Sequence, residues 1–470
     1  MTQESAVQRD ASARLTIDPE GRFRDDAGRV VTLRGVNVGG RSKWSPFLPF
    51  PLPASDSVEA LREAAAAFVA LGRAWGLNCV RLTFSWEAIE PERGRYDERY
   101  LQRLDLLVDA CWDAGWRVLL DFHQDVFAGA FSGDGFPAWC VPEADRAPPR
   151  HDDPQWFLGY VANPGVRRSF QRFWDNEEGL RDALLAMWQR VASRYRHHPG
   201  VLGFEIINEP GWGEAEDIVA WKQEVLTPFH EEVARLLRAI APDKLVFWDG
   251  PGIDALYARH AIFPRPQGEG LVFAPHLYDA GLINGQPWTG ERPEPAIEHL
   301  AAFRRDHATP VLIGEFGVAD GAQGWEEWLT RAMDAIDAHQ LSCTLWEFSR
   351  NEELWNGEDL SVVDAAGNER AVLDVFVRPW LRALAGSEPH VAWIPQEGRL
   401  HVRWLSAGGT TEIVLPERCL RGQAPSLSVV GEGVTWRHEA ARQTLFVTVA
   451  DAGDATPPRP VDLQVWLGRP

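Results

Sequence analysis

Residues 201–210, VLGFEIINEP, form a short apolar and β-branched run that ends in Asn208, Glu209 and Pro210. A run of this length, apolar on both faces, is typical of a strand in a parallel sheet that helices cover on both sides. In such sheets the functional groups lie at the carboxyl ends of the strands. The pattern therefore predicts an α/β fold with Asn208 and Glu209 at its functional edge.

A second run, PVLIGEFG at 310–317, repeats this pattern and carries Glu315 near its end. The glycines around Glu315 allow backbone or ligand to approach closely. Two carboxylates at strand ends are the minimum that cleavage of a glycosidic bond requires. We predict that Glu209 is the general acid and base, and that Glu315 is the nucleophile that forms a covalent intermediate.

The rest of the first 384 residues alternates apolar runs with amphipathic segments. The predicted strands are 33–38, 79–84, 117–122, 201–207, 244–248, 271–275, 311–313 and 343–346. The predicted helices between them include 57–75, 100–114, 179–195, 217–241, 295–306 and 325–339. Eight such repeats favour a (β/α)8 TIM barrel over a doubly wound sheet.

The sequence also predicts how the chain is divided. Residues 14–33 are typical of a hairpin that covers the bottom of the barrel, and 372–383 of a closing helix before a linker at 385–389. Short alternating strands follow, without a helical stretch. We expect a catalytic barrel at 14–384 and a C-terminal antiparallel β-sandwich domain at 388–470 that packs on it and contributes stability.

The connection at 126–178, between the third strand and its helix, is far longer than an ordinary βα loop. Its aromatic content is too high for a disordered tract. We interpret it as a folded lid over the strand ends that binds the aglycone. The alternative is an excursion of the barrel wall with a small core of its own.

Composition limits the classes of function. The 470 residues carry 47 basic and 68 acidic side chains, a net charge of −21, which disfavours nucleic acid as a partner. The five scattered cysteines predict reduced, buried thiols and no metal site. The amino terminus has no basic start before an apolar stretch, and no later run predicts an integral membrane segment. We expect a cytoplasmic protein, although a processed secreted form would look the same; the oligomeric state is not predicted.

Other predicted strand ends are also polar or aromatic. The residues concerned are His123, Asp125, His276, Tyr278 and Trp346, together with Arg81 in the second strand. Each histidine alone could be a core residue, and the arginine a buried structural cation. Together these residues predict a pocket of sugar-hydroxyl partners with one aromatic floor. Asn208 can both donate and accept a hydrogen bond next to the reacting carbon.

Several motifs resemble those of glycoside hydrolase family 5, the retaining (β/α)8 enzymes. They are the NEP, EFG, HLYD and LWEF segments, which occur in the family's strand order over about residues 30–380. The HQD motif, the LRGVNV opening, the FWDNEEGL stretch and the trailing β-domain are similar to the endoglycoceramidase and glucosylceramidase or steryl-glucosidase branch.

The resemblance implies roles for individual residues. It implies Glu209 as acid and base, Glu315 as nucleophile, and Arg81 and Tyr278 as supports of the nucleophile. The residues that it implies at the sugar are Asn208, at the 2-hydroxyl, and His123, Asp125, Trp346 and Lys43. The implied enzyme needs no cofactor.

We therefore predict a retaining O-glycoside hydrolase that cleaves a β-glucoside of an apolar aglycone, such as a glycosylceramide or a steryl, aryl or alkyl glucoside. An enzyme similar to endo-β-1,4-glucanases is the main alternative. In such an enzyme the lid would obstruct the open cleft that a polysaccharide needs. A barrel hydrolase with a metal on His123, Asp125 and His276 is a minor alternative. A sugar-binding protein without activity would not need both glutamates.

Overall fold

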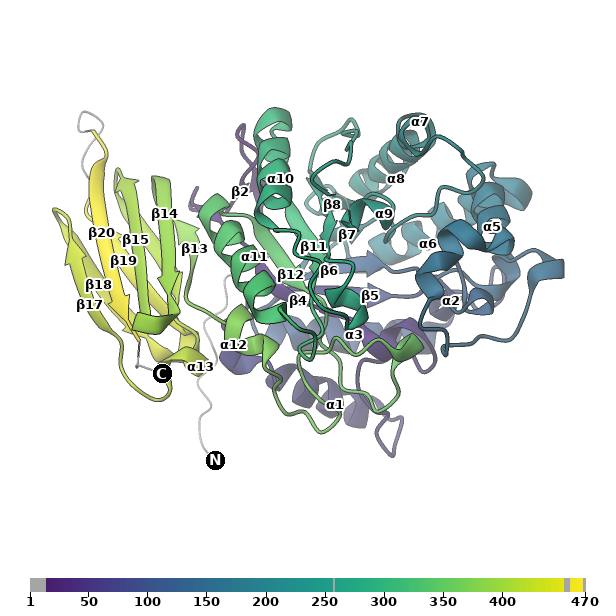
Figure 1. The fold of residues 1–470 in the computed structure, drawn as a ribbon, viewed down its shortest axis with the longest axis horizontal. Helices are drawn as coiled ribbons and strands as arrows, with labels where there is room; N and C mark the ends of the chain where they lie inside the picture. The colour runs from purple at the N-terminus through teal and green to yellow at the C-terminus, as the bar shows by residue number, and fades with distance from the viewer. Residues whose placement is uncertain (1–13, 257, 452–456, 468–470) are drawn as a thin grey trace.

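The computed structural model describes residues 14–256, 258–451 and 457–467. Within them, the centre of the molecule is a curled parallel sheet in the order β10-β11-β12-β4-β5-β6-β7-β8-β9 (Figure 1). Its strands are β4 (Arg34–Val38), β5 (Cys79–Phe84), β6 (Arg117–Phe122), β7 (Val201–Glu205), β8 (Leu245–Trp248), β9 (Leu271–Phe273), β10 (His276–Leu277), β11 (Leu312–Phe316) and β12 (Ser342–Leu345). A parallel bridge between Phe273 and Val311 joins β9 to β11. The predicted TIM barrel is confirmed, with its sixth strand divided into β9 and β10.

Helices surround this sheet. The longer ones are α1 (Val58–Ala70), α3 (Glu98–Asp113), α5 (Pro164–Trp174), α6 (Leu180–Tyr195), α8 (Thr227–Ile240), α10 (Glu294–His307) and α11 (Trp325–His339). The shorter ones are α2 (Trp86–Ile89), α4 (Gly159–Ala162), α7 (Ile218–Trp221), α9 (Ile253–Leu256), α12 (Val372–Phe376) and α13 (Glu417–Leu420). Ser57 and Asp97 accept hydrogen bonds from the first free amides of α1 and α3, which fixes where these helices begin. None of the described helices combines the length and hydropathy that crossing a bilayer requires.

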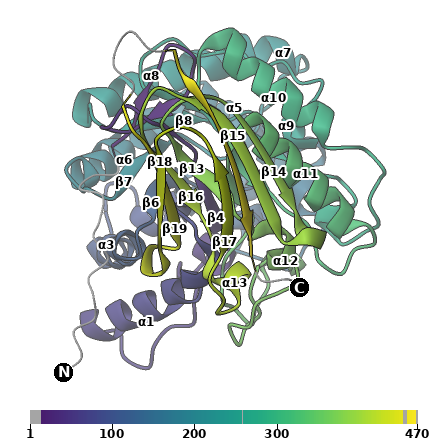
Figure 2. The same ribbon diagram turned by 90° about the vertical axis from the view of Figure 1, so that its left-hand side faces the viewer.

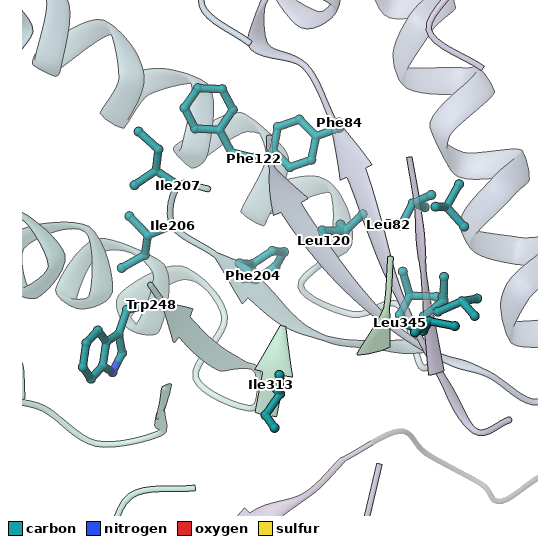
Figure 3. Packing of buried hydrophobic residues seen from close by; sticks show 14 of the residues in the cluster. Leu82, Phe84, Leu120, Phe122, Phe204, Ile206, Ile207, Trp248, Ile313 and Leu345 are labelled. Carbon is teal, nitrogen blue, oxygen red and sulfur yellow. The ribbon is translucent and has the colours of Figure 1, made fainter. Parts of the chain in front are cut away.

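Strand alternation decides which side chains enter the barrel. In β5, Leu82 and Phe84 pack in the same large cluster as the surrounding helices (Figure 3). Because neighbouring residues of a strand point to opposite faces, Arg81 lies on the inner side. The five cysteines are free thiols, buried except for the half-buried Cys419, as predicted.

Two antiparallel sheets form the β-sandwich at the left of Figure 1, seen face on in Figure 2. One has the order β1-β2-β3-β13-β16-β19-β18 and the other β14-β15-β20-β17. The strands are β1 (Thr16–Ile17), β2 (Phe23–Arg24), β3 (Val30–Val31), β13 (Trp380–Leu384), β14 (Ser387–Ile394), β15 (Arg399–Ser406), β16 (Gly409–Val414), β17 (Ser426–Val430), β18 (Val434–Glu439), β19 (Thr444–Val449) and β20 (Arg459–Trp466). The amino-terminal hairpin thus belongs to the same sheet as the C-terminal strands.

The segment around residue 380 differs from the prediction. The helix expected over 372–383 ends at Phe376, and 380–384 form β13, which pairs with β3 and β16. The expected linker contains only a two-residue turn before β14 begins at Ser387. The free edge of β3 explains the difference, because it offers backbone partners that the local helical pattern does not reveal.

Residues 126–178 are folded. Phe127, Phe136, Phe170 and Phe173 are nearly inaccessible and pack edge to face or stacked on one another, in one cluster with the barrel core. The segment also reaches the loop after β12, where the rings of Trp156 and Trp355 lie 4.8 Å apart. It therefore shares the core of the barrel rather than forming a small core of its own, and it also borders the strand ends.

Glu412 links the amino-terminal hairpin to the C-terminal strands of the same sheet. Its carboxylate accepts hydrogen bonds from Arg29 at 2.8 Å and from Arg382 at 3.0 Å, and its side chain is 9% exposed. Burial alone would raise the pKa of Glu412, but the two guanidinium groups outweigh it and the pKa lies below its usual value.

We expect Glu412→Gln to lower the free energy of unfolding by about 3 kcal/mol at neutral pH, because it removes the anion of the partly buried Arg382 and leaves Arg29 with Asp25 alone. Since the folded-state pKa is depressed, the difference should shrink as the pH falls through the range where Glu412 becomes protonated. Denaturant unfolding measures both effects. The control, Glu397→Gln, removes an exposed ion pair with Arg399 and should cost less than about 1 kcal/mol. Equal losses in the two variants would contradict the connecting role of Glu412.

Candidate active site

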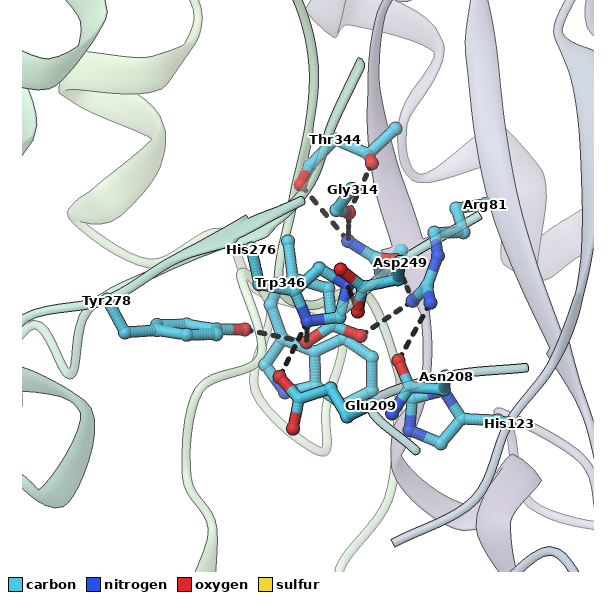
Figure 4. A network of polar contacts seen from close by, with 12 residues as sticks. Arg81, His123, Asn208, Glu209, Asp249, His276, Tyr278, Gly314, Thr344 and Trp346 are labelled. Atoms are coloured by element: carbon cyan, nitrogen blue, oxygen red, sulfur yellow. Dashed lines mark hydrogen bonds and ion pairs between the residues drawn. The ribbon is translucent and has the colours of Figure 1, made fainter. Parts of the chain in front are cut away.

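All ten residues singled out from the sequence lie at or near the carboxyl ends of the barrel strands and form two groups of contacting side chains, which Asp121 joins through its contacts with Arg81 and His123. They are Lys43, Arg81, His123, Asp125, Asn208, Glu209, His276, Tyr278, Glu315 and Trp346, and most are drawn in Figure 4. The connection from residue to residue is by hydrogen bonds, ion pairs and ring contacts, as described below.

Glu315 lies in β11 and is held from two sides. Its Oε1 accepts a hydrogen bond from Nη1 of Arg81 at 2.6 Å, and its Oε2 accepts one from the Tyr278 hydroxyl at 2.9 Å. Burial alone would raise the pKa of Glu315, but the positive charges of His276 and Arg81 outweigh it, so that this pKa is lowered. The carboxylate is therefore ionised and fixed in orientation, as a nucleophile requires.

Arg81 is completely buried and is the centre of the network. It donates two hydrogen bonds to Glu205, at 2.8 and 2.7 Å, and one to Asn208 Oδ1 at 2.8 Å. Asp121 lies 3.2 Å from the same guanidinium. Glu205 and Asp121 were not predicted as site residues, although Glu205 is visible as a charge inside the apolar run at 201–207.

Glu209 follows β7 in a strained backbone conformation, with φ of 37°. The amide of Gln124 donates to the carbonyl oxygens of Asn208 and Glu209, at 2.7 and 2.8 Å, and holds this turn. Oε1 of Glu209 lies 2.7 Å from Nδ1 of His276. A Cβ at Gly252 would lie 2.5 Å from Oε2 of Glu209, so the glycine leaves room for the Glu209 carboxylate in this position.

One oxygen of Glu209 and one of Glu315 lie within 4.8 Å of each other, with His276 between them. This is the close arrangement of carboxylates, in which one of them can attack the sugar directly. In the wider arrangement a water molecule would have to fit between the sugar and the second carboxylate.

The other half of the pocket consists of His123, Asp125, Lys43 and Trp346. The imidazole of His123 stacks on Trp346 with ring centres 5.2 Å apart, and Nζ of Lys43 lies 2.8 Å from Asp125. Burial alone would lower the pKa of His123, but Asp121 and Asp125 raise it to about 10. Burial would raise the pKa of Asp125, but Lys43 lowers it to about 2. Fixed charges and one aromatic face therefore surround a space for polar hydroxyl groups.

A neighbouring pocket lies beside Trp346 and was not predicted. Glu358 accepts the indole N–H of Trp346, and Trp355 lies under Lys43, whose Nζ is 3.8 Å from the ring centre. Burial raises the pKa of Glu347 to about 8, and its Oε1 accepts from Ser349 at 2.7 Å. Glu358 and Trp355 lie in a loop without a periodic pattern, so only the tertiary structure brings them to the site.

Two groups of side chains have the composition of metal ligands, namely His123, Asp125 and Asp134, and Glu209, His276 and Glu315. In the first, the Lys43 ammonium is already bound to Asp125. In the second, Arg81 and Tyr278 donate to Glu315. In each group a protein cation therefore already binds one carboxylate, whereas both oxygens of Asp134 are without a hydrogen-bond partner in the described part of the chain. The ammonium of Lys43 and the guanidinium of Arg81 also repel a second cation, so neither group fits a divalent metal well.

A parallel barrel with two close carboxylates at its strand ends is the arrangement of glycoside hydrolases. The family model of cellulase, glycosyl hydrolase family 5, matches residues 44–352. The chain belongs to glycosyl hydrolase family 5 and is an O-glycoside hydrolase.

Among individual proteins, endoglycoceramidase I of Rhodococcus hoagii (strain 103S) is 32% identical over 351 residues, which is 67% of each chain. The structure of endo-glycoceramidase II from Rhodococcus sp., in a complex with a five-membered iminocyclitol, matches with a TM-score of 0.71 and 25% identity. That match covers 95% of this chain and all of the other. Sterylglucosidase 1 of Cryptococcus neoformans has a TM-score of 0.75 at 16% identity, covers 97% of both chains and shows the shared fold.

We expect a chelator such as EDTA to leave hydrolysis of an aryl β-glucoside unchanged, because Lys43 and Arg81 already bind Asp125 and Glu315 and repel a divalent cation. Initial rates before and after dialysis against the chelator test this. Activity that is lost on chelation and restored by zinc or manganese would support the metal-dependent alternative.

Proposed function

We propose that the protein is a retaining β-glycosidase that cleaves a β-glucosidic bond to an apolar aglycone, and that its substrates are glycolipids. The observation that carries the proposal is the close approach of Glu209 and Glu315, within 4.8 Å. A separation this short suits double displacement through a glycosyl-enzyme intermediate.

In the proposed reaction, the ionised Glu315 attacks the anomeric carbon while Glu209 donates a proton to the departing aglycone oxygen. In the second step Glu209, now a carboxylate, takes a proton from a water molecule, whose oxygen attacks the anomeric carbon and breaks its bond to Glu315. The sugar is released, Glu315 is again a carboxylate and Glu209 is again protonated. Arg81 and Tyr278 keep Glu315 ionised and oriented until it attacks. In this scheme Asn208 hydrogen-bonds with the 2-hydroxyl of the sugar. The hydrogen bond from Arg81 to its Oδ1 fixes the orientation of the amide for this contact.

Two observations support an apolar aglycone. Two of the relatives named above are endoglycoceramidases, and their names specify a ceramide-linked substrate. In this chain, Phe157, Leu158 and Leu354 are 37 to 46% exposed, beside or close to the Trp156–Trp355 contact at the rim of the site. Burial of apolar surface contributes about 25 cal/mol per Å², so an acyl chain or sterol over this rim would gain several kcal/mol.

The second candidate is an enzyme similar to endo-β-1,4-glucanases. The description of the matching family model, cellulase, favours it. An open polysaccharide cleft needs flat aromatic platforms over several sugar units, whereas three tryptophans described at this rim, Trp156, Trp346 and Trp355, gather around the single ammonium of Lys43.

The roles of the glutamates predict different mutant behaviour. Glu315→Gly should lose detectable turnover, and azide should restore it by forming a glycosyl azide of inverted configuration. Glu209→Ala should lower kcat on alkyl glucosides by about 10²- to 10⁴-fold but spare activated aryl glucosides. The exposed Glu216→Ala should behave as wild type.

Proton NMR of the wild-type reaction should show the β-anomer first, and an initial α-anomer would exclude retention.

The aglycone is tested by comparing kcat/KM for cellobiose, cellotetraose, an alkyl β-glucoside, glucosylceramide and a lactosyl lipid. We expect the lipid glycosides to exceed cellotetraose at least about tenfold, which corresponds to 1.4 kcal/mol. Leu354→Asn should reduce the preference, whereas Val430→Asn, on the exposed face of the sandwich, should not. A higher value for cellotetraose would favour the glucanase alternative. Release of intact lactose would identify endo action.

A further inference from the structure

Asp249 is a buried carboxylate that the proposed reaction does not use. It follows β8 directly and is 4% exposed. Its Oδ1 accepts a hydrogen bond from the Gly250 amide at 2.7 Å, but its Oδ2 has no hydrogen-bond partner among the described residues. An unpaired oxygen on a buried carboxylate is costly, so its surroundings require an explanation.

The group opposite Asp249 is the imidazole of His276 (Figure 4). Nε2 of this ring lies 3.5 Å from Asp249 Oδ2 and is likewise without a hydrogen-bond partner in the described part of the chain. On its other side, Nδ1 lies 2.7 Å from Glu209 and 3.5 Å from Glu315. One ring therefore connects Asp249 with both carboxylates of the active site, and a small movement would complete the hydrogen bond to Asp249.

The surroundings of the ring are mostly acidic. The titratable and charged groups that face it or its carboxylate partners are Glu205, Glu209, Asp249, Asp254, Tyr278 and Glu315, with Arg81 and Lys222 as cations. Burial alone would lower the pKa of His276, but Asp249, Glu315 and Glu209 raise it to about 10. Burial also raises the pKa of Asp249, so the two groups compete for a proton. The His276 ring holds the proton, because it faces three carboxylates, those of Asp249, Glu209 and Glu315.

We propose that Asp249 is a positioning residue that acts through His276: it fixes the ring against Glu209 and keeps a positive charge between the two catalytic carboxylates. The proposal rests on the proposed function. The ring is thereby held against Glu209, the acid and base of the proposed reaction. Its positive charge favours the ionised form of Glu315. Asp249 itself touches neither the substrate nor the reacting atoms.

The test uses the full chain and the pH profile of kcat/KM for an aryl β-glucoside, which reports the pKa values of the free enzyme. Asp249→Asn keeps the size of the side chain but removes the anion that holds the ring protonated. We expect the acidic limb, which reports the ionisation of Glu315, to move to higher pH, because Glu315 loses a neighbouring cation. His276→Asn should move this limb in the same direction, which tests the proposal even if Asp249→Asn does not fold.

The double variant Asp249→Asn/His276→Asn should have the profile of His276→Asn alone, since a residue that acts through another adds nothing once the other is removed. The matched control is Asp462→Asn, which breaks an Asp–His contact of 3.0 Å to His401 in the sandwich and should leave the profile unchanged. An acidic limb that stays in place, or a further shift in the double variant, would overturn the proposal.

Nitrogen-15 chemical shifts of His276 provide a readout independent of activity, with His276→Asn to identify the signal. The ring should be protonated at pH 7 in the wild type and neutral in Asp249→Asn. An unchanged protonation state would contradict the inferred contact. If the wild type hydrolysed no glycoside, the proposed function would fail, whereas the nitrogen shifts would still decide whether Asp249 controls the ring.

Discussion

The buried guanidinium of Arg81 is the interaction on which the rest of the site depends. A completely buried cation is tolerated only when it is surrounded by anions and acceptors, and Glu205, Glu315 and Asn208 supply them from two other strands. Arg81 thereby ties β5 to β7 and β11 inside the barrel. The same contacts that make its burial possible keep Glu315 ionised. The hydrogen bonds that make the burial of Arg81 possible are therefore the same ones that set the charge and orientation of Glu315, and a change in one of them affects both.

The two glutamates have different surroundings because the barrel presents them differently. Glu315 lies within its strand and is 5% exposed, so it can be fixed by side chains from neighbouring strands. Glu209 lies four residues beyond the end of β7, in a strained turn that Gln124 holds through backbone carbonyls. A nucleophile benefits from rigid ionisation, whereas an acid and base must change its protonation during each cycle. The turn gives Glu209 fewer fixed partners, and His276 is the principal one.

Much of this could be predicted from the sequence, because apolar runs of strand length that end on polar residues are local patterns. Such runs identified the eight barrel strands and most of the ten site residues, whereas Lys43 was implied only by the resemblance to the family. The pattern failed where partners come from distant segments: 380–384 form a strand because β3 offers a free edge, and Glu358 reaches the site through tertiary packing. A lone carboxylate in a loop, such as Glu358, has no periodic signal, so its burial beside Trp346 could not be inferred. Asp249 and Glu347 directly follow the predicted strands 244–248 and 343–346, so the same pattern could have identified them.

The seven-stranded sheet of the sandwich takes its strands from both ends of the chain, and this affects how the protein is made. The hairpin with β3 is synthesised before the barrel, yet its residue Arg29 pairs with Glu412, 383 residues further along the chain. Contacts at such sequence separation cost loop-closure entropy and form late. Until β13 is made, the edge of β3 lacks its partner strand, and such open edges are prone to aggregation. Synthesis of β13 and β16, rather than formation of the barrel, therefore completes this sheet.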